Sequence, residues 1–260
     1  MRQKNGRVYL VGAGPGDPEL ITLKGLRCLR VADVIIYDRL ISPALLKAAP
    51  PEVKRIFVGK ASGCHALAQE KINDLLIAHA RNGSTVVRLK GGDPFLFGRG
   101  GEEAEALAEA GIPYEIVPGV TSAIAAPAYA GIPITHRDYA AQVTIVTGHE
   151  SISDQQAASV NWKALAKLGG TLVILMGLSN LARISCRLIA FGMPSLTPVA
   201  VIEQGTLPAQ RMVTGPLEHI AAQVAAAEIR SPAIIVIGTV TELHKSLVWF
   251  DTGNHTPGRK

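Results

Sequence analysis

The sequence predicts an α/β fold of two α/β domains, an N-terminal domain with a mostly parallel sheet and a C-terminal domain with a mixed sheet. Short runs rich in β-branched residues alternate with longer amphipathic runs through the first half of the chain, which is typical of βαβ units. The same alternation begins again near residue 143. With 260 residues and 48% hydrophobic content, the chain is long enough to bury a core in each domain.

The first domain is expected to contain five strands and at least three helices. The strands are short apolar runs at residues 8–11, 34–37, 56–58, 86–89 and 115–117. Apolar residues recur at spacings of three and four in the runs expected to be helical, at residues 19–31, 67–80 and 102–110. Gly83 and Gly111 stand where C-terminal helix stops are expected.

The loops that follow these strands are expected to form the ligand-binding edge. Ligands bind beyond the carboxyl ends of the strands in a parallel sheet. The loops that begin at Gly12, Asp38, Gly59 and Gly91 should therefore share one edge of the sheet. The glycine-rich and charged segments of the first domain are therefore expected to lie close together at this edge.

The second domain is expected to contain strands at residues 143–146, 171–175, 199–202, 211–213 and 234–237, with helices between several of them. Residues 211–213 follow the preceding strand after a short turn, which indicates an antiparallel neighbour and a mixed sheet. We place the domains at residues 6–134 and 140–250. Because residues 121–138 contain Pro127, Gly131 and Pro133, they are expected to form a hinge and the floor of an active-site cleft between the domains.

Composition excludes several classes of protein. The longest apolar runs are far shorter than the roughly 20 residues that cross a bilayer, and the basic start is followed by too short an apolar run for a signal peptide. We therefore expect a cytoplasmic protein. Three cysteines without a C-x-x-C pair, and not at ligand spacing from the histidines, predict reduced thiols and no metal site. The net charge of +5 favours an anionic partner.

The glycine loop at residues 11–17, VGAGPGD, invites comparison with the dinucleotide-binding fingerprint G-x-G-x-x-G. Asp17 stands in place of the third glycine, and its charge would repel a pyrophosphate at a helix N-terminus. Pro15 also removes a backbone donor. The loop suits a cofactor without phosphates better, although a purely structural turn is an equal alternative.

The most informative motif is RLKGGDPFLFGRGGEE, at residues 88–103. Five glycines in 11 residues permit close approach of the backbone to a ligand. Asp93 is placed to accept a hydroxyl hydrogen bond, for instance from a ribose. Phe95 and Phe97 argue against a purely solvated turn. We interpret the segment as a ligand-binding loop.

Together these motifs resemble the tetrapyrrole methylases, and within them the C-methyltransferases of uroporphyrinogen III. The resemblance extends over residues 8–250 and includes further segments: YDRL at 37–40, VGK at 58–60, PGVTS at 118–122, GIPITHRDY at 131–139, TGH at 147–149 and MGL at 176–178. The glycine loop occurs in methylases of other substrates, whereas YDRL, the 88–103 run and GIPITHRDY are more specific.

The resemblance implies transfer of methyl groups from two S-adenosyl-L-methionine molecules to carbons 2 and 7 of uroporphyrinogen III. The product is precorrin-2, on the routes to sirohaem, cobalamin or haem d1, and the other product is S-adenosyl-L-homocysteine. It also implies a homodimer, and neither a metal nor a nucleic-acid or membrane partner. Some members carry an N-terminal domain for oxidation and iron insertion. Because a strand is predicted from Val8, we expect the chemistry to stop at precorrin-2.

The resemblance also implies roles for individual residues. The cofactor-binding residues are Pro15, Gly91, Gly92, Asp93, Leu96, Thr121, Ser122, Met176 and Gly205. Groups that bind the substrate's eight carboxylates are Arg39, Lys60, Arg99 and Arg137, with Glu102 orienting one of them. The catalytic residues expected are Asp38, Arg39 and Glu102. Asp38 is the first candidate to accept the proton that the macrocycle loses, with a water molecule as the alternative.

Three alternatives have different consequences. A methylase of the same fold acting on a later corrin or on ribosomal RNA would retain the motifs, but the chain lacks the clustered basic and aromatic residues typical of RNA binding. A dinucleotide oxidoreductase would use Gly12, Gly16 and Asp38. A non-catalytic binding module is the third.

Overall fold

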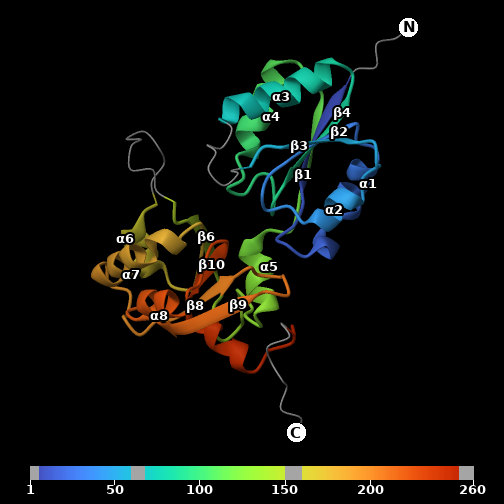
Figure 1. Ribbon diagram of the computed structural model, residues 1–260. Helices are drawn as coiled ribbons and strands as arrows, with labels where there is room; N and C mark the ends of the chain where they lie inside the picture. Colours follow the sequence, from blue (N-terminus) through green and yellow to red (C-terminus); the bar gives the residue numbers. More distant parts are fainter. Residues whose placement is uncertain (1–5, 60–67, 150–159, 252–260) are drawn as a thin grey trace. The chain divides into compact units, whose positions relative to one another are not determined.

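The computed structural model describes residues 6–59, 68–149 and 160–251. The chain divides into two compact units, Met1–Thr121 and Ser122–Lys260. Each unit contains one five-stranded sheet with helices packed on it (Figure 1). Within the described ranges, no helix combines the length and apolar character that crossing a bilayer requires.

The sheet of the first unit is entirely parallel. Its strands are β1 (Arg7–Gly12), β2 (Val34–Tyr37), β3 (Lys54–Phe57), β4 (Thr85–Lys90) and β5 (Tyr114–Val117). They lie in the order β3-β2-β4-β1-β5, and every neighbouring pair runs parallel. The predicted parallel sheet is confirmed, and the loops after β1, β2, β3 and β4 leave from one edge of it.

Helices cover both faces of this sheet. The helices α1 (Leu23–Arg30) and α2 (Pro43–Lys47) pack on one face, and α3 (Gln69–Arg81) and α4 (Gly100–Glu109) pack on the other (Figure 1). Alternate strand residues supply the two cores: Val87 and Leu89 belong to the α1 side, and Val86 belongs to the α3 side. This alternation follows from the period of two along a strand.

The central strands β1 and β4 form a topological switch point. They are neighbours, yet the chain continues from β1 to α1 on one face and from β4 to α4 on the opposite face. In open α/β sheets, ligands bind in the crevice that such diverging loops leave at the carboxyl edge. The topology therefore points to the loops after β1 and β4.

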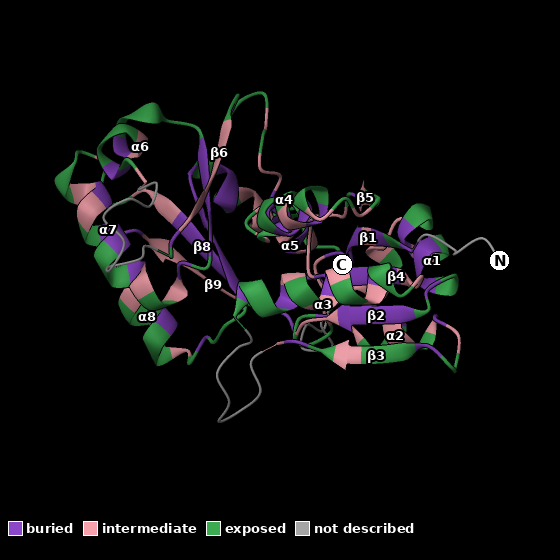
Figure 2. Cartoon of the chain, turned by 90° about the horizontal axis from the view of Figure 1, so that it is seen from above, coloured by how far each residue is buried: buried purple, intermediate pink, exposed green. Residues whose placement is uncertain are grey.

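The second unit contains a mixed sheet, as predicted. Its strands are β6 (Val143–Thr147), β7 (Thr171–Leu175), β8 (Pro198–Glu203), β9 (Arg211–Pro216) and β10 (Ala233–Ile237). They lie in the order β6-β7-β10-β8-β9, with β6 and β7 parallel and the other pairs antiparallel. One core joins the sheet to α6 (Trp162–Leu168), α7 (Leu181–Ala190) and α8 (Ile220–Ala226). In Figure 2, the inner strands β2 and β8 are mostly purple, whereas the edge strand β3 is green and pink.

The segment expected to form a hinge, residues 121–138, is helical in its first half. Ser122–Tyr129 forms the helix α5, which contacts β7 and β10 and buries Ala123, Ala125 and Ala126. Pro127 lies inside this helix and is itself buried. The high helix propensity of alanine and the burial of small side chains against the sheet outweigh the local break signal of proline.

The helix expected at residues 19–31 is also shorter than predicted. Pro18–Leu20 forms a 3₁₀ turn, capped by Asp17, whose carboxylate accepts a hydrogen bond from the Glu19 amide. The α-helix begins anew after Thr22, whose Oγ1 accepts from the Gly25 amide at 3.0 Å. Two consecutive N-caps thus divide a segment whose apolar spacing suggests one helix.

Candidate active site

Three loops converge at the carboxyl edge of the first sheet, after β1, β4 and β5. The amide of Gly92 donates to the carbonyl of Gly14 at 2.7 Å, and the amide of Ala13 donates to the carbonyl of Lys90 at 2.7 Å. A Cβ added to Gly119 would lie 2.3 Å from the Gly92 carbonyl oxygen and 2.7 Å from the Gly12 Cα. Glycine is therefore required for the loops to approach so closely, and the edge is lined by backbone.

This arrangement argues against a pyrophosphate site in the glycine loop. The amides of Ala13 and Gly14 donate to Lys90 and Gly92 within the protein. Asp17 places a carboxylate at the start of the following turn. A pyrophosphate needs free backbone donors and positive potential at this position, so the geometry disfavours the dinucleotide alternative.

Asp93 joins two of the three loops. Its Oδ1 accepts a hydrogen bond from the Phe95 amide at 2.8 Å, and its Oδ2 accepts from the Gly119 amide at 3.0 Å. Each carboxylate oxygen can accept a second hydrogen bond. The predicted role of Asp93 as acceptor for a ligand hydroxyl is compatible with this geometry and stays a prediction.

The other residues predicted to bind the cofactor in the first unit lie in the same loops. Pro15 follows β1, and Gly91 follows β4 with Leu40 beside it, because a Cβ on Gly91 would lie 3.0 Å from Leu40 Cβ. Thr121 follows β5, and its Cα would lie 3.9 Å from a Cβ on Gly92. Leu96 lies in the loop between β4 and α4 and is partly buried.

The remaining predicted cofactor residues belong to the second unit. Ser122 is the first residue of α5, and a Cβ on Gly205 would lie 2.3 Å from the Cβ of Ala126 in the same helix. Met176 follows β7, is exposed, and has a left-handed φ of 55°. Thr206, next to Gly205, has a φ of 72°, an unfavourable conformation for a β-branched residue. Such conformations cluster at functional sites.

Asp38 lies at the end of β2 with both carboxylate oxygens engaged. Its Oδ1 accepts a hydrogen bond from the Leu40 amide at 3.1 Å, and its Oδ2 lies 3.6 Å from Nη2 of Arg88. The Asp38 side chain is 29% exposed, whereas that of Arg88 is 5% exposed. A partly exposed carboxylate thus faces a buried guanidinium.

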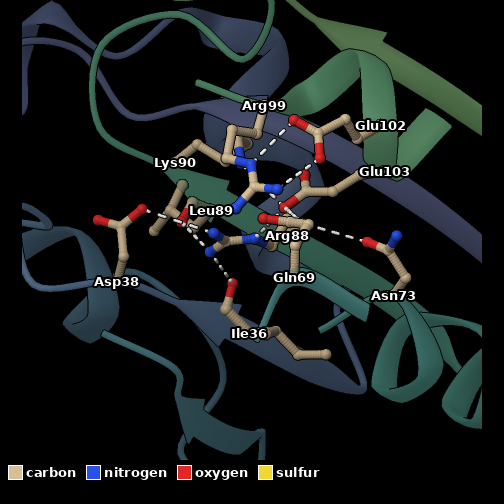
Figure 3. Close-up of polar contacts among 10 residues, drawn as sticks. All are labelled: Ile36, Asp38, Gln69, Asn73, Arg88, Leu89, Lys90, Arg99, Glu102 and Glu103. Atoms are coloured by element: carbon tan, nitrogen blue, oxygen red, sulfur yellow. Dashed lines mark hydrogen bonds and ion pairs between the residues drawn. The ribbon is translucent and has the colours of Figure 1, made fainter. Parts of the chain in front are cut away.

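Arg88 belongs to a buried charge network with Glu103 and Lys90 (Figure 3). Oε1 of Glu103 accepts from Arg88 Nε at 3.0 Å, from Lys90 Nζ at 2.9 Å and from Gln69 Nε2 at 3.3 Å. Burial, together with the positive charge of Arg88, lowers the pKa of Lys90 from its ordinary value, and Glu103 opposes this shift. Removal from water is the larger effect because the ammonium loses its hydration.

Arg99 and Glu102 form a separate pair, on the exposed side of the same loop and helix (Figure 3). Arg99 Nε and Nη2 donate to the two carboxylate oxygens of Glu102 at 2.8 and 2.6 Å. This bidentate contact lowers the pKa of Glu102 and raises that of Arg99. Both side chains are about half exposed, so the guanidinium is accessible to a carboxylate from solvent.

The predicted substrate-binding residues are divided between the two units. Arg39 is exposed beside Asp38 in the first unit, and Arg137 is exposed in the second. Lys60 lies outside the described residues. Within residues 6–59, 68–149 and 160–251, no group of three His, Cys, Asp or Glu side chains is placed to hold a metal ion.

The buried ion pairs of Arg88, Lys90 and Glu103 and the close loop contacts of Gly119 were not predicted from the sequence. The signal was present for two of them, since Arg88 and Lys90 alternate with Val87 and Leu89 in a strand that is otherwise apolar. Two charges on one face of a central strand predict a buried partner of opposite charge. For Gly119, the close approach to Gly12 and Gly92 is visible only in the fold.

Fold and site together define an α/β protein that binds a ligand at the carboxyl edge of a parallel sheet, with backbone-lined glycine loops and an Asp–Arg pair. Residues 7–221 match the family model of the Tetrapyrrole (Corrin/Porphyrin) Methylases. The chain belongs to this family, as the resemblance in its sequence predicted.

Individual relatives agree with this assignment. The chain is 51% identical over 242 residues to an S-adenosyl-L-methionine-dependent uroporphyrinogen III methyltransferase of Methanosarcina barkeri, covering 93% of this chain and 94% of that protein. It is 48% identical to a siroheme synthase of Nitrosospira multiformis over 97% of this chain, but it spans only 53% of that relative. A crystal structure of uroporphyrin-III C-methyl transferase from Thermus thermophilus, complexed with S-adenyl homocysteine, is similar with a TM-score of 0.77, 40% identity and coverage of 92% and 94% of the two chains.

Proposed function

We propose that this protein is an S-adenosyl-L-methionine-dependent C-methyltransferase that methylates uroporphyrinogen III at carbons 2 and 7 to give precorrin-2. The observation that carries the proposal is the match to the Methanosarcina barkeri methyltransferase, which extends over nearly the full length of both chains. The siroheme synthases that match are about twice as long, so the chain corresponds to about half of each. Sirohaem, cobalamin or haem d1 synthesis would use the product.

The carboxyl edge of the first sheet fits the proposed cofactor. Gly12 and Gly119 leave no room for a side chain among the converging loops, and Gly92 has a left-handed φ of 66°, so backbone groups line the edge. Pro15, Gly91, Gly92, Asp93, Leu96 and Thr121 would hold the cofactor from this unit, and Ser122, Met176 and Gly205 from the other. When bound, S-adenosyl-L-methionine supplies an electrophilic methyl group on a sulfonium. A loop whose Ala13 and Gly14 amides already donate within the protein suits such a cationic, phosphate-free ligand.

Arginines account for recognition of a polycarboxylate substrate. Arg99 already holds a carboxylate, Glu102, in bidentate geometry, and a substrate carboxylate presents the same chemistry. Arg39 and Arg137 are exposed and carry fixed positive charge, and Lys60 is included from the family resemblance. We propose that Glu102 orients Arg99 and yields it to the substrate.

Asp38 is the proposed proton acceptor. Methylation at a macrocycle carbon must be followed by loss of a proton from the carbon framework, and a carboxylate within reach can take it. Asp38 lies at the carboxyl edge, is partly exposed and is paired with the fixed cation Arg88. A water molecule is the alternative acceptor. The remaining work of the site is alignment of the reacting carbon and exclusion of water.

The proposal also covers the oligomeric state, the cellular compartment and the partners of the protein. We propose a homodimer in the cytoplasm, without a metal, and without a nucleic-acid or membrane partner. These points rest on the family resemblance, and the lack of clustered basic and aromatic residues in the sequence weighs against an RNA partner.

The test is anaerobic incubation of the purified protein with uroporphyrinogen III and S-adenosyl-L-methionine, followed by mass spectrometry. We expect a gain of two methyl groups. Asp38→Asn is expected to bind S-adenosyl-L-homocysteine as tightly as the wild type while losing most turnover, and calorimetry measures that binding. No methyl gain from protein that binds S-adenosyl-L-homocysteine would overturn the substrate, and stabilisation by NAD instead would overturn the class.

A further inference from the structure

We propose that Arg88 is a positioning residue for the reaction, which holds the Asp38 carboxylate in its orientation through a buried network anchored on Glu103. The inference rests on the proposed function in assigning proton acceptance to Asp38. It goes beyond that function because Arg88, Lys90 and Glu103 are not exposed to ligand and act through Asp38.

Arg88 is immobilised on three sides. Its Nε donates to Glu103 at 3.0 Å, and its Nη1 donates to the carbonyls of Leu89 at 3.2 Å and Ile36 at 3.3 Å. Ile36 lies in β2, two residues before Asp38. The guanidinium is therefore anchored to the strand that carries Asp38, which sets their separation (Figure 3).

The remaining nitrogen of the Arg88 guanidinium faces Asp38. Nη2 of Arg88 faces Asp38 Oδ2 at 3.6 Å, and Oδ1 accepts from the Leu40 amide. Asp38 is thus held at both oxygens, by a backbone donor and by a fixed cation. A planar guanidinium with its other nitrogens already bonded supplies direction as well as charge.

The charges of Arg88, Lys90 and Glu103 do not balance. Arg88, Glu103 and protonated Lys90 contribute two positive charges and one negative charge in the interior. Glu103 is 0% exposed, and its second oxygen, Oε2, has no hydrogen-bond partner among the described residues. The excess positive charge is therefore compensated by Asp38, the partly exposed member. Removing the Asp38 carboxylate would leave that charge buried without a counterion, which is unfavourable.

The charged groups that bear on Asp38 come from three elements. Arg88 and Lys90 face it from β4, Glu103 from α4 lies behind them, and Arg39 is its exposed neighbour in the chain. Of these, Arg88 is the group in direct ion-pair contact with Asp38 among the residues that the structure describes. Its removal should therefore have the largest effect on the position of the Asp38 carboxylate.

The experiment compares the wild type with Arg88→Gln and Arg88→Lys in two measurements. The first is the NMR spectrum of ¹³C-labelled aspartate carboxyl groups at neutral pH, with Asp38→Asn used to assign the Asp38 signal. In Arg88→Gln we expect the Asp38 signal to move, because the carboxylate loses the guanidinium that faces its Oδ2. Arg88→Lys retains the charge without the planar fork, and its Asp38 signal should lie between those of the wild type and Arg88→Gln.

The second measurement is steady-state kinetics with uroporphyrinogen III. In Arg88→Gln, kcat should fall about tenfold while KM changes less than about twofold, because the proton acceptor is misplaced while the substrate contacts remain. Arg88→Lys should recover part of kcat, and binding of S-adenosyl-L-homocysteine should not change in either variant. The matched control is Arg211→Gln, because Arg211 also pairs with a buried glutamate, Glu203, at 2.7 Å, but in the second sheet. It should lose stability without altering the Asp38 signal or kcat.

The outcomes separate this inference from the proposed function. An Asp38 signal that is unchanged in both Arg88 variants would overturn the inference. So would an unchanged kcat in Arg88→Gln. If the wild type does not methylate uroporphyrinogen III, the proposed function fails, and the NMR spectra still decide whether Arg88 holds Asp38. If Arg88→Gln does not fold, Arg88→Lys alone must move the Asp38 signal measurably or the inference is overturned.

Discussion

Glu102 and Glu103 are consecutive residues in the first turn of α4, and each pairs with an arginine, but their surroundings differ completely. The Glu103 side chain is 0% exposed and shares one oxygen among Arg88, Lys90 and Gln69. The Glu102 side chain is 49% exposed and holds Arg99 alone through both oxygens. The helix rotates by about 100° per residue, which directs one carboxylate toward β4 and the other outward.

This difference means that one motif contains both a buried ion pair and an exposed one, which suit different roles. A buried ion pair is weak evidence for net stability, but removal of one partner leaves an expensive uncompensated charge. An exposed pair contributes little to stability and can exchange partners at low cost. We therefore assign the buried pair to the support of Asp38 and the exposed pair to recognition of a carboxylate ligand.

The largest expected effect is on stability. Glu103→Gln leaves Arg88 and Lys90 buried without their anion and should lower the free energy of unfolding by about 3–5 kcal/mol. Glu102→Gln, the matched change one residue earlier, should cost less than about 1 kcal/mol. Urea unfolding of both variants measures the difference. Equal losses would contradict the division between buried and exposed pairs.

A triple variant sharpens the same comparison. Arg88→Met, Lys90→Met and Glu103→Leu together replace the buried charges by apolar groups, and the free energy of unfolding should return to within about 2 kcal/mol of the wild type. Activity should nevertheless stay as low as in Arg88→Gln, because Asp38 has lost its partner. If the triple variant is as unstable as Glu103→Gln, desolvation of the charges is not what makes the single change costly.

The exposed pair is expected to affect substrate binding. Arg99→Gln removes a bidentate carboxylate contact worth about 1.5–3 kcal/mol, so KM for uroporphyrinogen III should rise about tenfold to a hundredfold while kcat changes less than about twofold. Steady-state kinetics measure both constants. Arg230→Gln is the control, because Arg230 lies near another exposed glutamate, Glu228, at 3.6 Å. A fall in kcat with unchanged KM in Arg99→Gln would assign Arg99 to the chemical step instead.

The smallest expected effect is the pH dependence of the exposed pair. Because Arg99 lowers the pKa of Glu102 in the folded protein, the pair stabilises the fold fully above the unfolded value of 4.5 and loses this contribution as the pH falls through the lower folded value. A double-mutant cycle with Arg99→Gln and Glu102→Gln should give less than about 1 kcal/mol at neutral pH, and less again in 1 M salt. A coupling that grows on acidification would have the wrong sign.

Much of the fold was predictable from local patterns. Runs of β-branched residues placed the ten strands of the described ranges to within a few residues, and Gly83 and Gly111 end helices with φ of 82° and 67°, as expected for glycine stops. The five-residue helix α2 was missed because it is too short to display a helical period. The helix α5 was missed because proline and glycine signals were weighed without knowledge of the sheet against which it packs.

The sequence by itself determined the fold class, the glycine loops, and the gathering of glycine-rich and charged loops at one edge of the first, parallel sheet. These features follow from backbone preferences and short periods. Only the tertiary structure decided which charges are buried. The contacts of Arg88 with Ile36 and Glu103 join residues 52 and 15 positions away. Local sequence sets backbone dihedrals, whereas desolvation and charge pairing depend on neighbours that the fold alone brings together.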